Sequence, residues 1–593
     1  MSTIPGKTIA EKIFSAHAGT DAHAGDIVVA DVDFVMGQDG TSPLAIRALE
    51  NMGVDEVFDP GKVALVMDHS SPSPIEGVSA LHTIMREFGK KTGCTVYDVG
   101  EGVCHQLIPE KGRVVPGDLM VGCDSHTCTY GALNVFSTGV GSTDGAAAMA
   151  SGKLWFKVPD TMKVTYEGEL QPGVFSKDLI LYLAGQIGVD GATYEALEFH
   201  GPVIDALSVE ARMTISNMAI EVGAKAGLMK ADEKTLAWFE GRGEKTPAPQ
   251  VPDADATYIR ELTLDASVIG PQVAKPHAVD NVSPIEEVEG TPIAEGVLGT
   301  CTNGRLEDLA IAAKILEGRT VHPDVRFVVA PASRQILLDA IEAGYIQTLV
   351  AAGAALVTPG CGPCVGTHNG VPSDGENVIS TANRNFKGRM GNSNAFIYLG
   401  SPATVAASVI EGKITDPRKY FEGGEQKMKL SAKAFKNGDD INTDYIISGK
   451  YKFKSNDMEA MAVHAMEELD PEYYNKFKPE GGFLVAGTNF GMGSSREQAP
   501  LVLIHSNTQA VLAKTFARIF YRNAINTGLP VVECDTDLID EGDDLELDLT
   551  GGVLRNVTKG TDIAIKPLPP VMAQLLADGG LVEHFKKHGG FAL

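Results

Sequence analysis

The stretch Gly296-Val-Leu-Gly-Thr-Cys-Thr-Asn-Gly-Arg305 joins a short apolar run to a loop that carries a cysteine. The run 296–299 is typical of a buried strand, and the apolar residues of 306–316 recur at a helical period. The same alternation continues to about residue 424, which predicts an α/β domain with a mainly parallel sheet. Further strands are expected at 327–330, 355–358, 377–380 and 395–399.

Two more cysteines lie in Pro359-Gly-Cys-Gly-Pro-Cys-Val-Gly366, after another of these strands. The carboxyl ends of parallel strands meet at one edge of a sheet, so Cys301, Cys361 and Cys364 should lie together. A lone thiol is usually a small buried hydrophobe, but three at loop tips indicate metal ligands. Structural zinc would need a fourth protein ligand, and no second Cys-x-x-Cys or His-x-x-His accompanies them. We therefore expect one [4Fe-4S] cluster per chain, with one iron open to substrate.

Composition limits the class of protein. The 593 residues exceed one hydrophobic core, so about four domains are expected. The net charge of −27 opposes binding to nucleic acid and to anionic membranes. No apolar run of about 18 residues is present, and the first residues predict a helix capped by Thr8 and Glu11 rather than a signal peptide. The eight cysteines, several beside His or Asp, favour a reducing cytoplasm.

The pattern of strands resets near residues 420–427, and new strands are expected at 483–486, 510–513 and 530–533. We place a domain boundary at about 424–428, so that the last part of the chain forms a separate α/β unit. The expected divisions are 1–290, 291–424 and 428–593.

Three sets of histidines and carboxylates lie between residues 68 and 126. They are Asp68-His69, His105 and Asp124-Ser125-His126. A carboxylate beside an imidazole fixes its tautomer and raises its basicity, as general acid/base chemistry requires. Any one of them could be a buried structural histidine, but three sets in so short a stretch favour an active site.

Three further motifs have a functional and a structural interpretation. Asn217 and Glu221 are four residues apart, which predicts one helix face, either functional or merely solvated. Arg384 and Arg389 lie in a Gly- and Asn-rich loop and suit carboxylate recognition, or they belong to a surface loop. Ser494, in Gly491-Met-Gly-Ser-Ser-Arg-Glu497, precedes a helical segment and is either a catalytic group or a helix cap.

These motifs occur in the order typical of one family. Asp-Ser-His-Thr, Gly-Thr-Cys-Thr-Asn-Gly-Arg, Cys-Gly-Pro-Cys, Asn-Arg-Asn-Phe-x-Gly-Arg and Gly-Ser-Ser-Arg-Glu together resemble the aconitase superfamily, most closely its 3-isopropylmalate dehydratase and homoaconitase branch. Residues 1 to about 424 resemble the large subunit, and 428–593 resemble the small subunit. The resemblance implies a three-domain α/β large part with mainly parallel sheets, followed by a C-terminal swivelling α/β domain, so that no separate small subunit is needed.

The resemblance also implies roles for individual residues. Cys301, Cys361 and Cys364 would hold three irons of the cluster, and the fourth iron would bind substrate. Ser494 would be an alkoxide base, and His69 with Asp68 would protonate the leaving hydroxyl. The other implied catalytic residues are His105, Asp124, His126, Glu221 and Asp444. The implied substrate-binding residues are Gln38, Ser125, Asn217, Asn383, Arg384, Arg389, Ser495 and Arg496.

The substrate is less well defined. Thr129 stands where large aconitases have an Asn and favours the isopropylmalate branch, whereas Gln38 resembles a substrate-binding Gln of the large aconitases. In the family, the loop that corresponds to 448–456 contacts the substrate side group. Here it offers Lys452 and Lys454 for a carboxylate, or Tyr451 and Phe453 for an alkyl group.

We therefore expect a hydro-lyase that dehydrates or isomerises a 2-hydroxy di- or tricarboxylic acid. A 3-isopropylmalate dehydratase-like enzyme of amino-acid biosynthesis is favoured. A homoaconitase- or aconitase-type isomerase and a dimethylmalate-type dehydratase are alternatives. Two readings from other classes are an RNA-binding regulator without a cluster, which the negative charge opposes, and a zinc-stabilised binding protein, which leaves the paired histidines unexplained.

Overall fold

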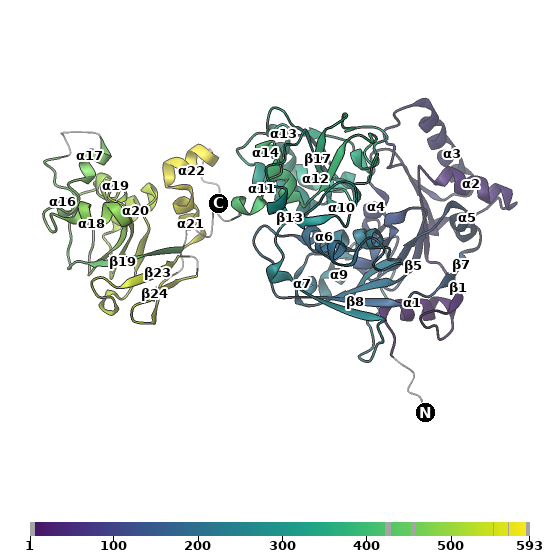
Figure 1. The fold of residues 1–593 in the computed structure, drawn as a ribbon, viewed down its shortest axis with the longest axis horizontal. Coiled ribbons are helices and arrows are strands. Elements are labelled where there is room, and N and C mark those ends of the chain that lie inside the picture. Colours follow the sequence, from purple (N-terminus) through teal and green to yellow (C-terminus); the bar gives the residue numbers. More distant parts are fainter. Residues whose placement is uncertain (1–5, 422–428, 452–456, 550, 567, 589–593) are drawn as a thin grey trace. The chain divides into compact units, whose positions relative to one another are not determined.

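The computed structural model describes residues 6–421, 429–451, 457–549, 551–566 and 568–588. It divides into two compact units, Met1–Tyr420 and Phe421–Leu593, and each is described here by itself (Figure 1). Both units combine helices with sheets, and the sheets of the first unit are mainly parallel, which confirms the predicted fold class. Among the described residues, no helix has both the length and the apolar character needed to cross a bilayer.

The first sheet is wholly parallel and has the strand order β4-β3-β2-β5-β6. Its core packs against α1, whose start is fixed as predicted: Thr8 Oγ1 accepts from the amide of Glu11 at 3.3 Å, and Glu11 accepts from the amide of Thr8 at 2.9 Å. The bounds are α1 Ile9–Ala18, β1 Ile27–Asp31, β2 Phe34–Gln38, α2 Ser42–Asn51, β3 Val63–Val66, α3 Glu76–Thr92, β4 Thr95–Tyr97, α4 Cys104–Glu110, β5 Leu119–Gly122, β6 Phe136–Gly139, α5 Ser142–Ser151 and β7 Lys153–Lys157, with β1 and β7 forming a separate antiparallel pair.

The second sheet is also parallel, with the order β10-β9-β8-β11. Its helix α6 lies against α8 and against the start of the third sheet. The bounds are β8 Thr161–Glu167, α6 Ser176–Ile187, β9 Ala196–His200, α7 Pro202–Ala206, α8 Val209–Asn217, β10 Ala226–Met229, α9 Glu233–Trp238 and β11 Arg260–Asp265.

The third sheet has the order β13-β12-β18-β17-β14-β15-β16 and contains the strands predicted between residues 296 and 399. Strands β14 to β18 are parallel, and the antiparallel β12 and β13 extend the sheet beyond β18. The strand expected at 355–358 is shorter: only Ala355 and Leu356 pair with β15, at the exposed edge of the sheet. The bounds are β12 Gln272–Ala274, β13 Val282–Pro284, β14 Glu295–Gly299, α10 Thr300–Asn303, α11 Leu306–Leu316, β15 Arg326–Ala330, α12 Arg334–Glu342, α13 Tyr345–Ala351, β16 Ala355–Leu356, β17 Asn377–Ser380, β18 Phe396–Leu399 and α14 Pro402–Glu411.

The second unit has one mixed sheet, β22-β21-β20-β19-β23-β24-β25. Strand β19 joins its halves: residues 434–436 pair in parallel with β20, and residues 429–433 pair antiparallel with β23. The bounds are β19 Lys429–Lys436, α16 Thr443–Ile446, α17 Met458–Ala462, α18 Tyr473–Glu480, β20 Gly482–Ala486, α19 Gln498–His505, β21 Thr508–Ala513, α20 Arg518–Thr527, β22 Val531–Glu533, β23 Asp544–Asp548, β24 Val553–Asn556, β25 Thr561–Ala564, α21 Pro570–Asp578 and α22 Leu581–His588.

Candidate active site

The three cysteines lie in loops that leave the third sheet. Cys301 is the second residue of the short helix α10, which directly follows β14, and Cys361 and Cys364 follow β16. All three are buried, with exposed fractions of 2%, 4% and 1%, and none forms a disulfide. The backbone brings Cys361 beside the loop after β3, because its amide donates to the carbonyl of Asp68 at 2.9 Å. Gly360 permits this approach: its φ is +158°, and a Cβ there would lie 2.9 Å from the same carbonyl oxygen.

N–H donors surround the sulfur atoms. Asn217 Nδ2 lies 3.4 Å and Asn383 Nδ2 3.5 Å from Cys301 Sγ, and Arg389 Nη2 lies 3.2 Å from Cys364 Sγ. Arg389 Nε is buried and has no partner among the described residues. Burial raises the pKa of Cys301 to about 11, and a bound metal cation would favour its thiolate form. The three thiols are buried and form no disulfide, N–H donors point at their sulfur atoms, and one N–H of Arg389 has no acceptor among the residues that the structure describes. These features fit an anionic metal–sulfur group.

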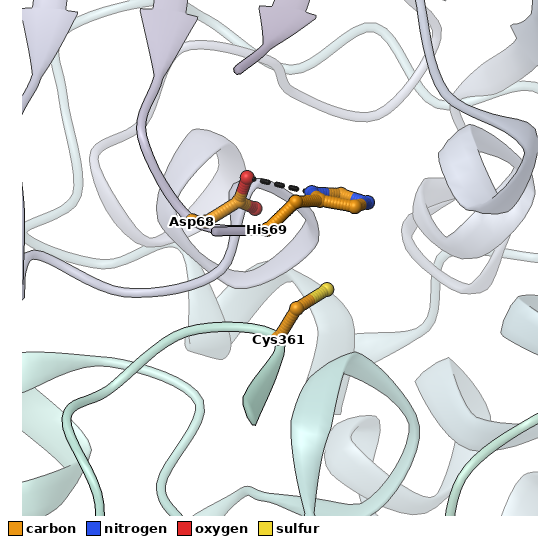
Figure 2. A group of neighbouring side chains, drawn as sticks. All are labelled: Asp68, His69 and Cys361. Atoms are coloured by element: carbon orange, nitrogen blue, oxygen red, sulfur yellow. Dashed lines mark hydrogen bonds and ion pairs between the residues drawn. The ribbon is translucent and has the colours of Figure 1, made fainter. Parts of the chain in front are cut away.

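The pair Asp68–His69 lies at the end of β3, next to Cys361 (Figure 2). His69 Nδ1 bonds Asp68 Oδ1 at 2.8 Å, and Asp68 Oδ2 accepts from the amide of Cys104 at 2.7 Å. One potential ligand atom from each of Asp68, His69 and Cys361 lies within 4.8 Å of the others. The imidazole of His69 is thus oriented by a buried carboxylate, with its other nitrogen 3.3 Å from Asp124 Oδ2.

Asp124 joins the three histidines that the sequence singled out. Its carboxylate accepts from His105 Nε2 at 2.7 Å and from the amide of His126 at 2.9 Å, in addition to facing His69. Burial alone would raise the pKa of Asp124, but its bonds to His105, His126 and His69 outweigh burial and hold that pKa well below its usual range. A stably ionised carboxylate therefore lies at the centre of the site.

A second chain of contacts begins at His126. Its Nε2 bonds Glu221 Oε1 at 2.8 Å, and Arg384 Nε lies 2.8 Å from the same oxygen. Arg384 Nη1 also donates to Ser125 Oγ at 3.0 Å. Gln38 Nε2 lies 3.5 Å from Asp124 Oδ2. A cavity of about 440 Å³, whose lining includes Gln38, Asp124 and Ser125, opens beside these residues and leaves room for a small organic acid.

The prediction that Asn217 and Glu221 share one helix face is wrong. Helix α8 ends at Asn217, and Glu221 lies in the 3₁₀ helix η3, Met218–Val222. The tighter turn leads to Gly223, whose φ of +88° ends the helical path. The two side chains nevertheless face the same site: Asn217 contacts Cys301, and Glu221 contacts His126.

Asp39, which no sequence motif indicated as a site residue, fixes the loop that carries His69. Its carboxylate accepts from the amides of His69 at 2.8 Å, Ser70 at 2.9 Å and Asp68 at 3.4 Å, and from His82 Nε2 at 3.1 Å. The residue follows Gln38 at the end of β2, in the same parallel sheet as β3. An acidic residue beside a named site residue at a strand end was the signal that could have identified it.

In the second unit, Ser494 lies exposed in the loop between β20 and α19. Its amide donates to Thr443 Oγ1 at 3.1 Å. The alternative interpretation of Ser494 as a helix cap is wrong, because α19 begins at Gln498 and Glu497 occupies its N-cap position. A cap would have to lie directly before the helix, where its oxygen meets the first free amides.

Arg496 and Asp444, also in this unit, form an ion pair at 2.5 Å, and Arg496 Nη1 donates to the carbonyl of Ile447 at 3.0 Å. Ser495 is exposed beside Ser494. Tyr451 donates to Glu467 at 2.7 Å. Lys452 and Lys454 lie outside the described residues.

Comparison with known proteins covers most of the chain. Residues 11–412 match the model of the aconitase family (aconitate hydratase), and residues 418–536 match the aconitase C-terminal domain. The chain is 54% identical to 3-isopropylmalate dehydratase large subunit 1 of Methanopyrus kandleri and 55% identical to large subunit 1 of Thermotoga maritima, each over 70% of this chain and 100% of the relative. It is 52% identical to a probable methanogen homoaconitase large subunit of Methanosarcina mazei, over 66% of this chain and 100% of the relative.

Proposed function

Because the chain belongs to the aconitase family, and is thus a dehydratase of the hydro-lyase class, we propose that it is a [4Fe-4S]-dependent enzyme that removes and re-adds water on a 2-hydroxy di- or tricarboxylic acid. The observation that carries the proposal is that three buried cysteines and the oriented pair Asp68–His69 belong to the first unit, where Cys361 lies beside Asp68 and His69. Such dehydration needs a Lewis acid for the hydroxyl and a proton donor beside it, and this unit offers candidates for both.

Cys301, Cys361 and Cys364 would hold the cluster, which supplies a Lewis-acid iron for the substrate hydroxyl when bound. The protein also surrounds the cysteine sulfurs with hydrogen-bond donors. Asn217, Asn383 and Arg389 direct N–H groups at the sulfurs, and such outer contacts orient ligands and favour the anionic form.

His69 is proposed to donate a proton to the departing hydroxyl. Its orientation is fixed twice, by Asp68 through the ring and by Asp39 through the backbone amide. Asp124 carries a stable negative charge on the other side of the ring, which favours the protonated imidazole. A proton on Nε2 of His69 would lie on the opposite side of the ring from Asp68. There the N–H group that faces Asp124 could instead donate to the oxygen of the substrate hydroxyl.

Ser494 is proposed to remove the proton next to a substrate carboxylate. Its Oγ lies on an exposed loop and does not cap a helix, and Arg496 two residues on provides a fixed positive charge. Asp444 orients that arginine. Since the match to the aconitase C-terminal domain lies in the same chain, we propose that no separate small subunit is required.

The substrate carboxylates are proposed to bind Arg384, Arg389, Gln38 and Ser125. We favour an alkyl-substituted malate of the 3-isopropylmalate type, since relatives at 54–55% identity carry that name. A homoaconitate-type tricarboxylate is the second candidate, because a relative at 52% identity is named a probable homoaconitase large subunit.

The test is anaerobic reconstitution of the purified chain with iron and sulfide, followed by assays of alkene absorbance with 3-isopropylmalate, citrate, homocitrate and dimethylmalate. We expect alkene formation by the single chain, with the highest kcat/KM for 3-isopropylmalate. Cys301→Ser, prepared in parallel, should lack both the cluster absorbance and the activity. A reconstituted wild-type protein that converts none of the four acids would contradict the proposal.

A further inference from the structure

One buried lysine, Lys177, belongs to none of the sequence motifs and contacts the backbone next to Asn383. Lys177, the second residue of α6, has an exposed fraction of 0%. Its Nζ donates to the carbonyl oxygens of Thr381 at 2.9 Å and Ala382 at 2.7 Å. No ion pair joins it to a carboxylate within the described parts of the chain. The neighbouring Asp178 is engaged elsewhere, where its carboxylate accepts from the amides of Phe175 at 2.8 Å and Gln272 at 2.9 Å.

A buried ammonium group without a carboxylate partner is costly. Removing a full charge from water is strongly unfavourable unless hydrogen bonds and opposite charge compensate for it. Two carbonyl dipoles use two of its three N–H groups and supply only part of that compensation. The burial of Lys177 therefore indicates further negative charge nearby, beyond the carboxylates of Asp308 and Glu221, which influence its pKa without forming an ion pair with it.

The two carbonyls point to where that group lies. Thr381 and Ala382 directly precede Asn383, whose Nδ2 is 3.5 Å from Cys301 Sγ and whose Oδ1 accepts from the Cys364 thiol at 3.6 Å. One of the lysine's two acceptors thus belongs to the residue directly before Asn383, which contacts two of the cysteine sulfurs. Burial lowers the pKa of Lys177 to about 7, and the strongest opposing influences are the charges of Cys364 and Cys301 in their thiolate forms.

The backbone held by Lys177 at Thr381 and Ala382 also leads into Arg384. Arg384 follows Asn383 and reaches both Glu221 and Ser125. A cation that holds the backbone at 381–382 therefore fixes the starting point of the Asn383 amide, which faces the cysteines, and of the Arg384 guanidinium, which contacts Ser125 and Glu221.

We propose that Lys177 is a positioning residue that anchors the Asn383–Arg384 turn and provides the buried positive charge that balances the anionic cluster on the three cysteines. This inference rests on the proposed [4Fe-4S] site and extends it to a group that touches neither iron nor substrate. A positive charge near a cluster favours its reduced, more negative state, so the lysine should raise the reduction potential and slow oxidative loss of iron.

The test compares anaerobically reconstituted wild type with Lys177→Met and Lys177→Gln. Met removes the charge and the donors, whereas Gln removes the charge and keeps N–H donors for the carbonyls. Asp178→Asn is the matched control, because it disturbs the hydrogen bonds of the same helix and leaves the cation in place. The measurements are the midpoint potential of the cluster by mediated EPR titration, the rate of cluster bleaching in air, and KM against kcat.

Both lysine variants should show a more negative midpoint potential and bleaching in air faster by about tenfold or more. Met, which also frees the turn, should raise KM by about tenfold, while Gln should raise it less. Asp178→Asn should lose thermal stability without moving the potential. Potentials and bleaching rates equal to wild type in folded lysine variants would overturn the proposal, as would failure of both to fold in the presence of iron and sulfide. A wild-type protein without a cluster would instead refute the proposed function.

Discussion

Replacing Asp39 with Asn tests whether the active-site loop is fixed by a buried charge. The carboxylate accepts from three successive backbone amides and from His82. Burial alone would raise its pKa, but the bond to His82, the charge of His69 and the amides of Ser70 and His69 lower it from 3.8 to about 2. A shift of about 1.8 units corresponds to ~2.5 kcal/mol of stabilisation when the group is ionised.

The substitution should therefore lower the free energy of unfolding of the first unit by about 2–3 kcal/mol at pH 7, the range for losing hydrogen bonds to a charged acceptor. Because the folded pKa is depressed, the contribution of Asp39 is complete well above pH 3.8 and declines as the pH falls toward 2. The difference between wild type and Asp39→Asn should thus stay constant from pH 8 to about 5 and shrink below about 4.

The assay is urea unfolding of the metal-free protein, followed by tryptophan fluorescence. Both tryptophans of the chain, Trp155 and Trp238, belong to the first unit, so the signal reports on that unit. Asp31→Asn is the control, since Asp31 is 65% exposed and forms an ion pair with the exposed Lys153, and it should change stability by less than about 0.5 kcal/mol. If Asp39→Asn lowers the free energy of unfolding as little as the control does, or by an amount that does not change with pH, then the charge of Asp39 does not stabilise the loop.

Three further outcomes follow from the site. Ser494→Ala should lower kcat about 10³-fold or more with the cluster retained, and a variant that keeps more than about a tenth of the activity would show that Ser494 is not the base. Arg384→Lys cannot reach Glu221 and Ser125 together, so KM should rise about 10- to 100-fold at unchanged iron content; an unaltered KM would remove Arg384 from substrate binding. Lys452→Ala and Lys454→Ala should leave kcat/KM for 3-isopropylmalate within about twofold, whereas a selective loss on homocitrate, with homocitrate the better wild-type substrate, would reverse the preferred specificity.

The regular part of the fold was accessible from the sequence. The run Asn377–Ser380 forms β17 with the predicted bounds, because a continuous apolar run is typical of a strand that is buried on both faces. Leu306–Leu316 forms α11, because a 3.6-residue period of apolar residues is typical of a helix that is buried on one face. The strand expected at 355–358 is shorter because pairing at a sheet edge depends on a neighbour that the local sequence does not specify.

The contacts of the site were only partly accessible. The pairs of His105 with Asp124 and of His126 with Glu221 are formed, although spacing alone gave Glu221 the wrong local structure. Asp39 and Lys177 were missed because each acts on backbone groups of a distant loop. A polar residue that stabilises the main chain of another element leaves no periodic pattern, so only the folded structure identifies it.

Three cysteines are proposed to hold a cluster in which one iron lacks a protein ligand, and such an iron should be lost in air. The most direct measurement is EPR of the reconstituted protein after brief exposure to air, combined with activity before and after anaerobic addition of ferrous iron and reductant. Air should produce a three-iron signal and abolish alkene formation, and ferrous iron with reductant should restore both the four-iron form and the activity. Zinc in place of iron, or activity indifferent to air and to chelator, would contradict it.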